Sequence, residues 1–190
     1  LIKKEFDYYR GKKEPHPYMK ESGLNAIPAQ HDMLDQWRHV FTGVQYKLPD
    51  KDYLLFGGID DLWINSSNEY IVTDYKATAK NDTPTLDGKW GKKYRNQIEF
   101  YQWLLRNNDL KVSNSSYFLY CNGRKDIDTF DGKIEFNIHM IEHVGDDSWV
   151  EPTIYKAIEV LENNIPPDAD PECEFCNYVD TRKVNEKNFG

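Results

Sequence analysis

The chain has 190 residues, of which 39% are hydrophobic and 14% aromatic, so it is long enough and apolar enough to form one domain with a full core. No apolar run approaches the roughly 20 residues that a membrane span needs, so we expect no membrane partner. The formal net charge of −8 disfavours nucleic acid as a partner of the whole surface, but Lys and Arg gather around positions 76–80 and 89–95, which is compatible with a local basic stripe.

The cysteine content indicates the compartment. Three cysteines in a chain of this length argue against a disulfide framework and for a reducing environment. We therefore expect a cytoplasmic protein.

The beginning of the chain predicts mainly helix and loop. Residues 1–29 are polar and interrupted by prolines, which indicates an N-terminal extension with a short helix around Phe6–Arg10 followed by a loop. In residues 30–40 apolar side chains recur at helical spacing, which predicts an amphipathic helix. A short β segment over 44–48 follows it.

The remainder of the chain predicts a sheet with helices packed on it. The expected strands are 53–64, 70–76, 116–122 and a half-exposed strand from Ile134 onward. The expected helices are 91–106 and the segment that begins "DDSWV", and residues 164–190 are expected to form a loop-like tail. This order predicts one α/β domain over residues 1–190, with a mixed central β-sheet flanked by α-helices.

The two strands around the turn "NSSN" carry charge in an otherwise apolar hairpin. Residues two apart on a strand project from the same face, so Asp74 and Lys76 point together. A three-residue turn, Ser66–Asn68, would set Asp60 opposite Asp74, whereas a two-residue turn would put Asp61 on that face. In either register two carboxylates and a lysine converge.

Such a group of side chains suits a hard divalent cation. Buried carboxylates repel one another unless a cation or a shared proton compensates, and Mg²⁺ accepts one or two acids together with water and substrate phosphate. A neighbouring lysine can orient or deprotonate the attacking water, and this is the equipment for metal-assisted phosphodiester hydrolysis. The alternative is an ordinary solvated Asp–Lys pair.

The helix expected at 91–106 adds two polar groups. Gln97 and Tyr101 are four residues apart, hence on one helical face, and can hydrogen-bond a phosphate or the nucleophilic water. The alternative is that Tyr101 is a core aromatic residue and Gln97 a boundary residue.

Together these residues carry a family resemblance. "GGID", then "DYK" with its Asp74 fourteen positions after Asp60, then "QIEFY" resemble the G-x-x-D, D-x-K and Q-x-x-x-Y motifs of the PD-(D/E)XK nuclease superfamily, specifically its RecB-like branch. Ile59 stands where the superfamily name has proline, and the second acid is aspartate. The resemblance covers about Phe56–Leu105 and implies a restriction-endonuclease-like core.

The resemblance also implies roles for individual residues. Asp60 would be the bridging metal ligand, with Asp61 as the runner-up, Asp74 the second ligand and the backbone carbonyl of Tyr75 a third. The implied cofactor is Mg²⁺ or Mn²⁺. Lys76 would assist the nucleophile, and two further side chains would hold the active site and the substrate. The implied catalytic residues are Asp60, Asp74, Lys76, Gln97 and Tyr101.

Two further groups of residues are candidate metal ligands. In RecB-like nucleases a histidine or acid on a helix ahead of the sheet often completes the metal shell, and the candidates here are His31, Asp32 and Asp35, with His31 first. Cys173 and Cys176 have metal-ligand spacing, but an iron–sulfur cluster usually requires four thiolates. We therefore expect no Fe–S cluster, and leave open whether these two cysteines bind another metal.

We expect from the resemblance a metal-dependent, exonuclease-like DNA nuclease that acts on single strands or duplex ends in recombination, repair or mobile-element processing. Because the chain is acidic, we also expect a protein partner that delivers the substrate. The alternative is a catalytically silent nucleic-acid-binding or scaffolding module with the same fold.

Overall fold

A five-stranded mixed sheet is the centre of the structure, a computed structural model that describes residues 1–129 and 131–189. Its strands are β1 (Ala26–Pro28), β4 (Asp61–Asn65), β5 (Tyr70–Thr78), β6 (Ser115–Gly123) and β7 (Phe136–Val144). They lie in the order β1-β4-β5-β6-β7, and β5 and β6 are parallel whereas the other neighbours are antiparallel. The predicted α/β class with a mixed central sheet is confirmed.

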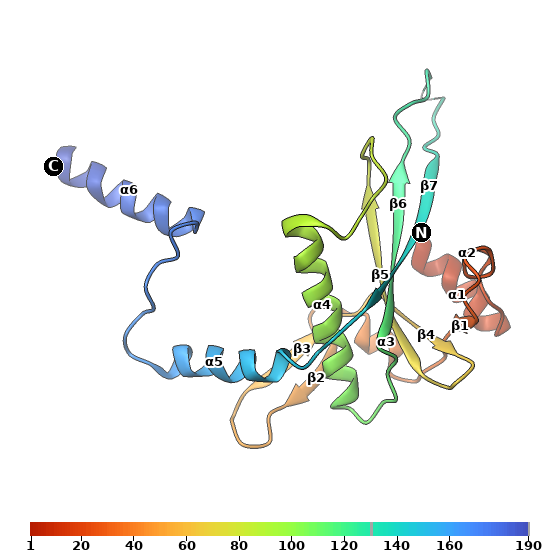
Figure 1. Cartoon of the computed structure of the whole chain (residues 1–190), viewed down its shortest axis with the longest axis horizontal. Coiled ribbons are helices and arrows are strands. Elements are labelled where there is room, and N and C mark those ends of the chain that lie inside the picture. The colour runs from red at the N-terminus through yellow and green to blue at the C-terminus, as the bar shows by residue number, and fades with distance from the viewer. Residues whose placement is uncertain (130, 190) are drawn as a thin grey trace. The chain divides into compact units, whose positions relative to one another are not determined.

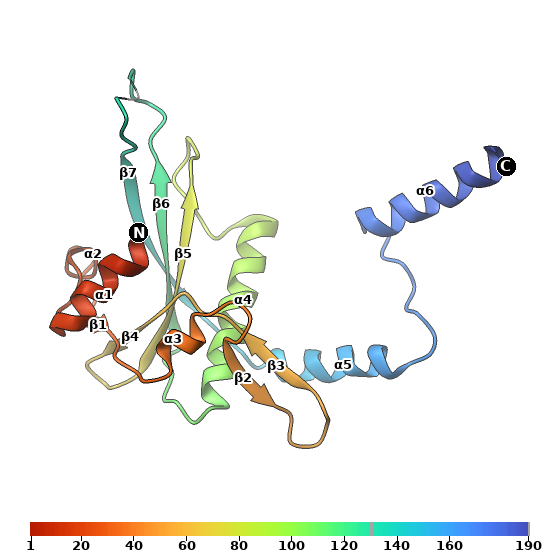
Figure 2. The same ribbon diagram turned by 180° about the vertical axis from the view of Figure 1, so that it is seen from behind.

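Two helices cover opposite faces of this sheet, α1 (Ile2–Lys12) and α4 (Gly88–Arg106), as Figures 1 and 2 show. Neighbouring residues of β6 project to opposite faces of the sheet. Phe118 lies beside Tyr94 of α4, whereas Leu119 packs in the cluster that contains Phe6 of α1. Between α1 and β4 the chain forms, besides β1, two short helices and a separate hairpin. The helices are α2 (Pro17–Glu21) and α3 (Leu34–Trp37), and the hairpin is the two-stranded sheet of β2 (Val44–Lys47) and β3 (Leu54–Gly57).

The chain divides into two compact units, Leu1–Val150 and Glu151–Gly190. The first contains the sheet, and the second contains most of α5 (Val150–Glu162) and α6 (Glu174–Phe189). Within the described residues no helix combines the length and the apolar character that crossing a bilayer requires.

The core on the α1 face is built around stacked aromatic rings. Phe6 is fully buried, and its ring stacks on Trp63 of β4 with centroids 5.4 Å apart and on His16 at 4.2 Å. Such pairs contribute roughly 0.5–1.5 kcal/mol each beyond the burial of apolar area. Residues 1–29 therefore supply part of the core and, through β1, an edge strand of the main sheet.

The turn between β4 and β5 decides the register of the charged hairpin. Asn65 pairs with Glu69 through a backbone hydrogen bond of 3.0 Å, which leaves the three-residue turn Ser66–Asn68. Asn68 has a left-handed φ of 58°, as expected for the last position of such a turn, where asparagine is tolerated. Asp61 is consequently opposite Thr73, and the same register sets Asp60 opposite Asp74.

Several predicted boundaries were wrong. The expected single strand over 53–64 is two strands in different sheets, β3 and β4, interrupted at Gly58–Asp60. The helix expected over 30–40 is reduced to the single turn of α3, and the tail at 164–190, expected to be loop-like, contains the 16-residue helix α6. The loop expected after the first helix includes α2 and β1.

Candidate active site

The two aspartates Asp60 and Asp74 face each other where the hairpin opens. β4 begins at Asp61, so beyond Thr73 strand β5 no longer pairs with it, and the backbone amide of Tyr75 instead donates a hydrogen bond of 2.9 Å to Asp60 Oδ2. The N–H and C=O of one strand residue point to the same edge, so the Tyr75 carbonyl is directed toward the Asp60 side as well. Two carboxylates and a backbone carbonyl thus share one edge of β5.

Asp74 and Lys76 form the most buried ion pair on this face. Asp74 is only 4% exposed, and its Oδ2 lies 2.6 Å from Lys76 Nζ. Apart from this ion pair, Oδ2 has no hydrogen-bond partner of normal geometry among the described residues. Burial raises the pKa of the Asp74 carboxyl, the Lys76 ammonium opposes this, and the charge of Asp60 adds to it.

Lys76 links the carboxylates to α4. Its Nζ lies 3.4 Å from Gln97 Oε1, a long hydrogen bond, and 4.2 Å from the centroid of the Tyr94 ring, within the range of a cation–π interaction. Gln97 Nε2 in turn donates to Tyr101 Oη at 2.9 Å. The structure therefore connects Asp74, Lys76, Gln97 and Tyr101 in one chain of polar contacts.

Tyr101 is held in place by a glycine of the resembling motif. A Cβ atom at Gly57 would lie 2.6 Å from Tyr101 Cε1, so only glycine lets the ring approach β3 this closely. Burial raises the pKa of the Tyr101 hydroxyl, Gln97 lowers it, and the charges of Asp74 and Asp60 raise it further. The hydroxyl therefore stays protonated at neutral pH and can donate a hydrogen bond.

Asp61, the runner-up ligand, points to the other face of the sheet. It is fully buried, and its carboxylate accepts from Arg10, from Arg38 Nη2 at 2.6 Å and from the Tyr75 hydroxyl at 2.6 Å. Burial and the charge of Asp61 raise the pKa of the Tyr75 hydroxyl well above its ordinary value. Asp61 thus binds α1 and the segment after α3 to the sheet, and its oxygens are occupied by protein donors.

Lys3 also reaches the site, although it was not predicted from the sequence. Its Nζ lies 2.8 Å from Asp60 Oδ1, in an ion pair whose side chains are 41% and 29% exposed. Lys3, Phe6 and Arg10 follow the spacing of one helical face, and this is the signal that could have assigned α1 to the site.

The candidates on the helix ahead of the sheet lie elsewhere. His31 stacks on Trp37 with centroids 4.2 Å apart, and its Nδ1 accepts from the Met33 amide. His31, Asp32 and Asp35 line a pocket that they share with Arg10 and Arg38, the partners of Asp61. The contacts of these three residues therefore do not support a place in the metal shell.

The three cysteines are divided between the two units. Cys121 is half-buried in β6, whereas Cys173 and Cys176 lie at the start of α6 in the second unit. Within 1–129 and 131–189 no group of three or more His, Cys, Asp or Glu side chains is placed to hold a metal ion.

The donor set at the hairpin opening nevertheless fits Mg²⁺ or Mn²⁺. Asp60 and Asp74 provide two hard oxygen ligands, and Mg²⁺ typically takes one or two carboxylates and completes its shell with waters and phosphate oxygens. The buried Asp74 Oδ2 with only an ammonium beside it, and the ammonium of Lys3 at Asp60, indicate a place where positive charge is needed. The two carboxylates and the Tyr75 carbonyl are the groups that would hold such an ion.

One of three comparisons with known proteins found a match. A family model described as the PD-(D/E)XK nuclease superfamily matches residues 3–181. No curated protein and no solved structure matches the chain.

Proposed function

Because the chain belongs to the PD-(D/E)XK nuclease superfamily, we propose that it is a Mg²⁺- or Mn²⁺-dependent nuclease of the RecB-like type that hydrolyses phosphodiester bonds in DNA. One observation carries the proposal. Asp60 and Asp74 are opposite each other across the hairpin, and the Lys76 ammonium lies 2.6 Å from Asp74 on the same face. A buried carboxylate opposite a partly exposed one, with a lysine beside them, is an arrangement that suits metal-assisted phosphodiester hydrolysis.

Each polar residue of the site has a distinct role in this proposal. When bound, the metal ion supplies Lewis-acid stabilisation of the phosphate and lowers the pKa of a water molecule. Asp60, Asp74 and the Tyr75 carbonyl would hold the ion. The Lys76 ammonium, which lies 2.6 Å from Asp74 Oδ2, donates a hydrogen bond to the attacking water or to a phosphate oxygen and offsets the negative charge that develops there.

Gln97 and Tyr101 position this lysine and the substrate. The Gln97 amide is polarised by two contacts, since its oxygen faces Lys76 and its nitrogen donates to Tyr101. The Tyr101 proton is then free to be donated to a phosphate oxygen or to the water. Both residues act on the α4 side of the carboxylates, so together they orient the nucleophile before attack.

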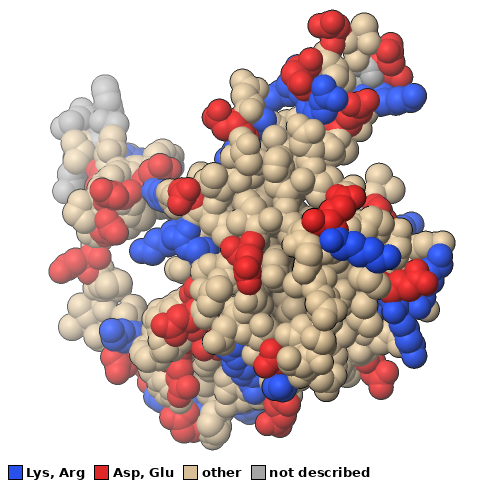
Figure 3. All heavy atoms as spheres, turned by 45° about the vertical axis from the view of Figure 1, so that its right-hand side comes forward, with Lys and Arg blue, Asp and Glu red and all other residues tan. Residues whose placement is uncertain are grey.

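The substrate is DNA with single-stranded or duplex ends, processed in an exonuclease-like manner during recombination, repair or mobile-element processing. On the face drawn in Figure 3 acidic side chains lie between the basic ones, in line with the net charge of −8. Such a surface attracts duplex DNA weakly at physiological salt. This supports a protein partner that delivers the substrate. The three free cysteines suit a reducing compartment such as the cytoplasm as the place of action.

The test is a cleavage panel with the full chain. End-labelled single-stranded, duplex and flapped DNA, with RNA of the same sequence, are incubated with Mg²⁺, Mn²⁺ or chelator. We expect cleavage only with metal, and a loss of at least about 100-fold in Lys76→Ala and Asp74→Asn. Lys111→Ala is the matched control, because Lys111 is an exposed lysine whose partner is Glu69 at the other end of the hairpin.

Two results would overturn the proposal. The first is equal cleavage by the wild type and by both site variants. The second is DNA binding in chelator without cleavage in either metal, which would instead favour the non-catalytic binding or scaffolding module.

A further inference from the structure

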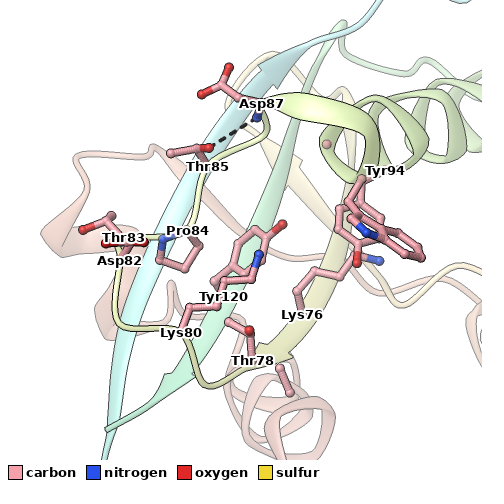
Figure 4. A pocket seen from close by; sticks show the side chains of 13 residues that line it. Lys76, Thr78, Lys80, Asp82, Thr83, Pro84, Thr85, Asp87, Tyr94 and Tyr120 are labelled. Atoms are coloured by element: carbon pink, nitrogen blue, oxygen red, sulfur yellow. Dashed lines mark hydrogen bonds between the residues drawn. The ribbon is translucent and has the colours of Figure 1, made fainter. Parts of the chain in front are cut away.

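A pocket of about 460 Å³ lies directly beside Lys76 (Figure 4). Its walls come from the end of β5, the connection to α4, the first turns of α4 and Tyr120 of β6. Its volume falls in the range of sites that enclose small organic ligands. Lys76 belongs both to the carboxylate pair and to this pocket, so whatever fills the pocket lies next to the scissile phosphate.

The connection that forms one wall, residues 80–87, is fastened at both ends. Asn122 is nearly buried, and its side chain accepts from the Lys80 amide at 2.8 Å and donates to the Lys80 carbonyl at 3.0 Å. At the other end the Arg95 side chain donates a hydrogen bond to the Leu86 carbonyl oxygen. This oxygen packs against Gly91, where a Cβ atom would lie 1.8 Å from it, so only glycine fits at position 91. The pocket is therefore preformed.

Aromatic rings and ammonium groups alternate around this pocket. Trp90 is 64% exposed, although tryptophan usually buries most of its ring, and Lys93 Nζ lies 4.5 Å from the ring centroid. The Lys76 ammonium lies over the Tyr94 ring, and the nearly buried Tyr120 also lines the pocket. Exposed aromatic faces next to lysines are typical of surfaces on which unpaired nucleobases stack.

We propose that this pocket holds one unpaired nucleotide of the substrate, the one that adjoins the scissile phosphate, with its base stacked on Trp90. This inference rests on the proposed nuclease function and specifies its substrate as a single strand or an opened end. Lys76 and Lys80 face the sugar–phosphate backbone, and the exposed lysines of the first turns of α4, Lys89 and Lys92, continue that path.

The acidic residues of the pocket support a base in it and disfavour a polyphosphate. Asp82 and Asp87 line the pocket together with Lys76 and Lys80, so the positive and negative side chains balance. A compact group of phosphates would meet two carboxylates, whereas a base can donate its exocyclic amino group to one of them. An intact duplex presents no free base face, and extracting a base from it requires unstacking and unpairing.

The test measures binding separately from cleavage. Fluorescence anisotropy in chelator records the affinity of labelled single-stranded DNA, single-stranded RNA and blunt duplex for the full chain. We expect the duplex to bind at least about tenfold more weakly than the single strands, because of the lost base stacking and the unpairing that insertion requires. Whichever of single-stranded DNA and single-stranded RNA binds more tightly shows whether the protein prefers deoxyribose or ribose.

Substitutions then locate the base. We expect Trp90→Ala to weaken single-strand binding roughly 5- to 150-fold, the range for removal of one stacking platform, while Trp90→Phe retains most of the affinity. Tyr8→Ala is the matched control, because Tyr8 is 58% exposed and also carries a lysine 4.2 Å over its ring. A series of single strands, each with an abasic residue at a different position, locates the bound base. The abasic residue should weaken binding to the wild type at one position only, and it should have no effect on binding to Trp90→Ala.

The outcomes separate this inference from the proposed function. If the wild type cleaves DNA but Trp90→Ala does not change the affinity for single strands, the pocket proposal is wrong and the nuclease proposal stands. The same conclusion follows if the effects of Trp90→Ala and of the abasic residue on affinity are additive. Single-strand binding that depends on Trp90, without any cleavage in Mg²⁺ or Mn²⁺, would support the pocket and overturn the nuclease.

Discussion

Exchanging each of the two adjacent aspartates for asparagine should separate catalysis from folding. Asp61→Asn places a neutral amide among Arg10, Arg38 and Tyr75, whereas Asp60→Asn changes a partly exposed carboxylate that pairs with Lys3. The two substitutions are chemically identical and one residue apart. Any difference in stability or cleavage between the two variants is therefore due to the position of the aspartate and not to the kind of substitution.

The expected magnitudes follow from burial. Asp61 is fully buried, and removing one partner of a buried ion pair leaves uncompensated charge and destabilises by about 3–5 kcal/mol. This is a large part of the roughly 5–15 kcal/mol by which a domain is typically stable, and it corresponds to a melting temperature lower by about 6–20 °C. The exposed Lys3–Asp60 pair contributes about 0–1 kcal/mol, and its loss is partly offset by relief of the repulsion with Asp74.

Urea denaturation followed by tryptophan fluorescence gives the free energy of unfolding, and the cleavage panel gives activity at a temperature where both variants are folded. We expect Asp61→Asn to lower stability and keep measurable cleavage, and Asp60→Asn to lose at least about 100-fold in cleavage with a stability within about 1 kcal/mol of the wild type. A stable Asp61→Asn variant would refute the structural role of Asp61, and full cleavage by Asp60→Asn would refute its place in the site.

Three further substitutions test other parts of the structure. The pKa of Tyr75 is raised well above its ordinary 10.0, so the unfolded chain loses this proton first and stability should fall as pH rises above about 10. Tyr75→Phe, compared in urea at several pH values, should show a smaller slope, and an unchanged slope would contradict the burial of this hydroxyl against Asp61. Gly57→Ala should displace Tyr101 and lower the cleavage rate about 10- to 100-fold. Gly58→Ala is the control, because a Cβ there would lie 3.3 Å from its nearest neighbour, and it should lower the rate less. Equal cleavage rates in the two variants would contradict the close packing of Tyr101 on Gly57. Phe6→Ala should lower the free energy of unfolding by about 3–5 kcal/mol, and a loss below about 1 kcal/mol would mean that residues 1–29 are a dispensable extension.

The hairpin and α4 could be predicted from the sequence because local signals determine them. Alternating apolar residues, a turn of Asn and Ser, and helical spacing in 91–106 are all readable within a few residues. The motif residues Asp74 and Gln97 lie within these elements, and Asp60 directly precedes β4. The register was open between two turn lengths. It was decided by the αL conformation of Asn68, which sequence alone permits but does not require.

The contribution of the N-terminal segment could not be predicted because it depends on contacts between residues far apart in the chain. Arg10 meets Asp61 across 51 residues, and the edge strand β1 pairs with β4 through only three residues. A polar segment interrupted by prolines carries no local sign of such pairing. The break between β3 and β4 has the same origin, since Leu54–Gly57 pairs with β2 and not with β5.

The pairing of Asn65 with Glu69 around the turn Ser66–Asn68 makes strand register a determinant of chemistry. Surface turns usually accept insertions and deletions freely, but here a change that shifts the pairing of β4 and β5 by one residue would exchange the two faces of β4. In one direction of this shift Asp61 would be opposite Asp74, and Asp60 would be carried to the side of the arginines. Along an evolutionary lineage this turn should therefore change only in ways that keep Asn65 opposite Glu69, or together with a compensating β-bulge, and this register should be as informative as the identity of the acids.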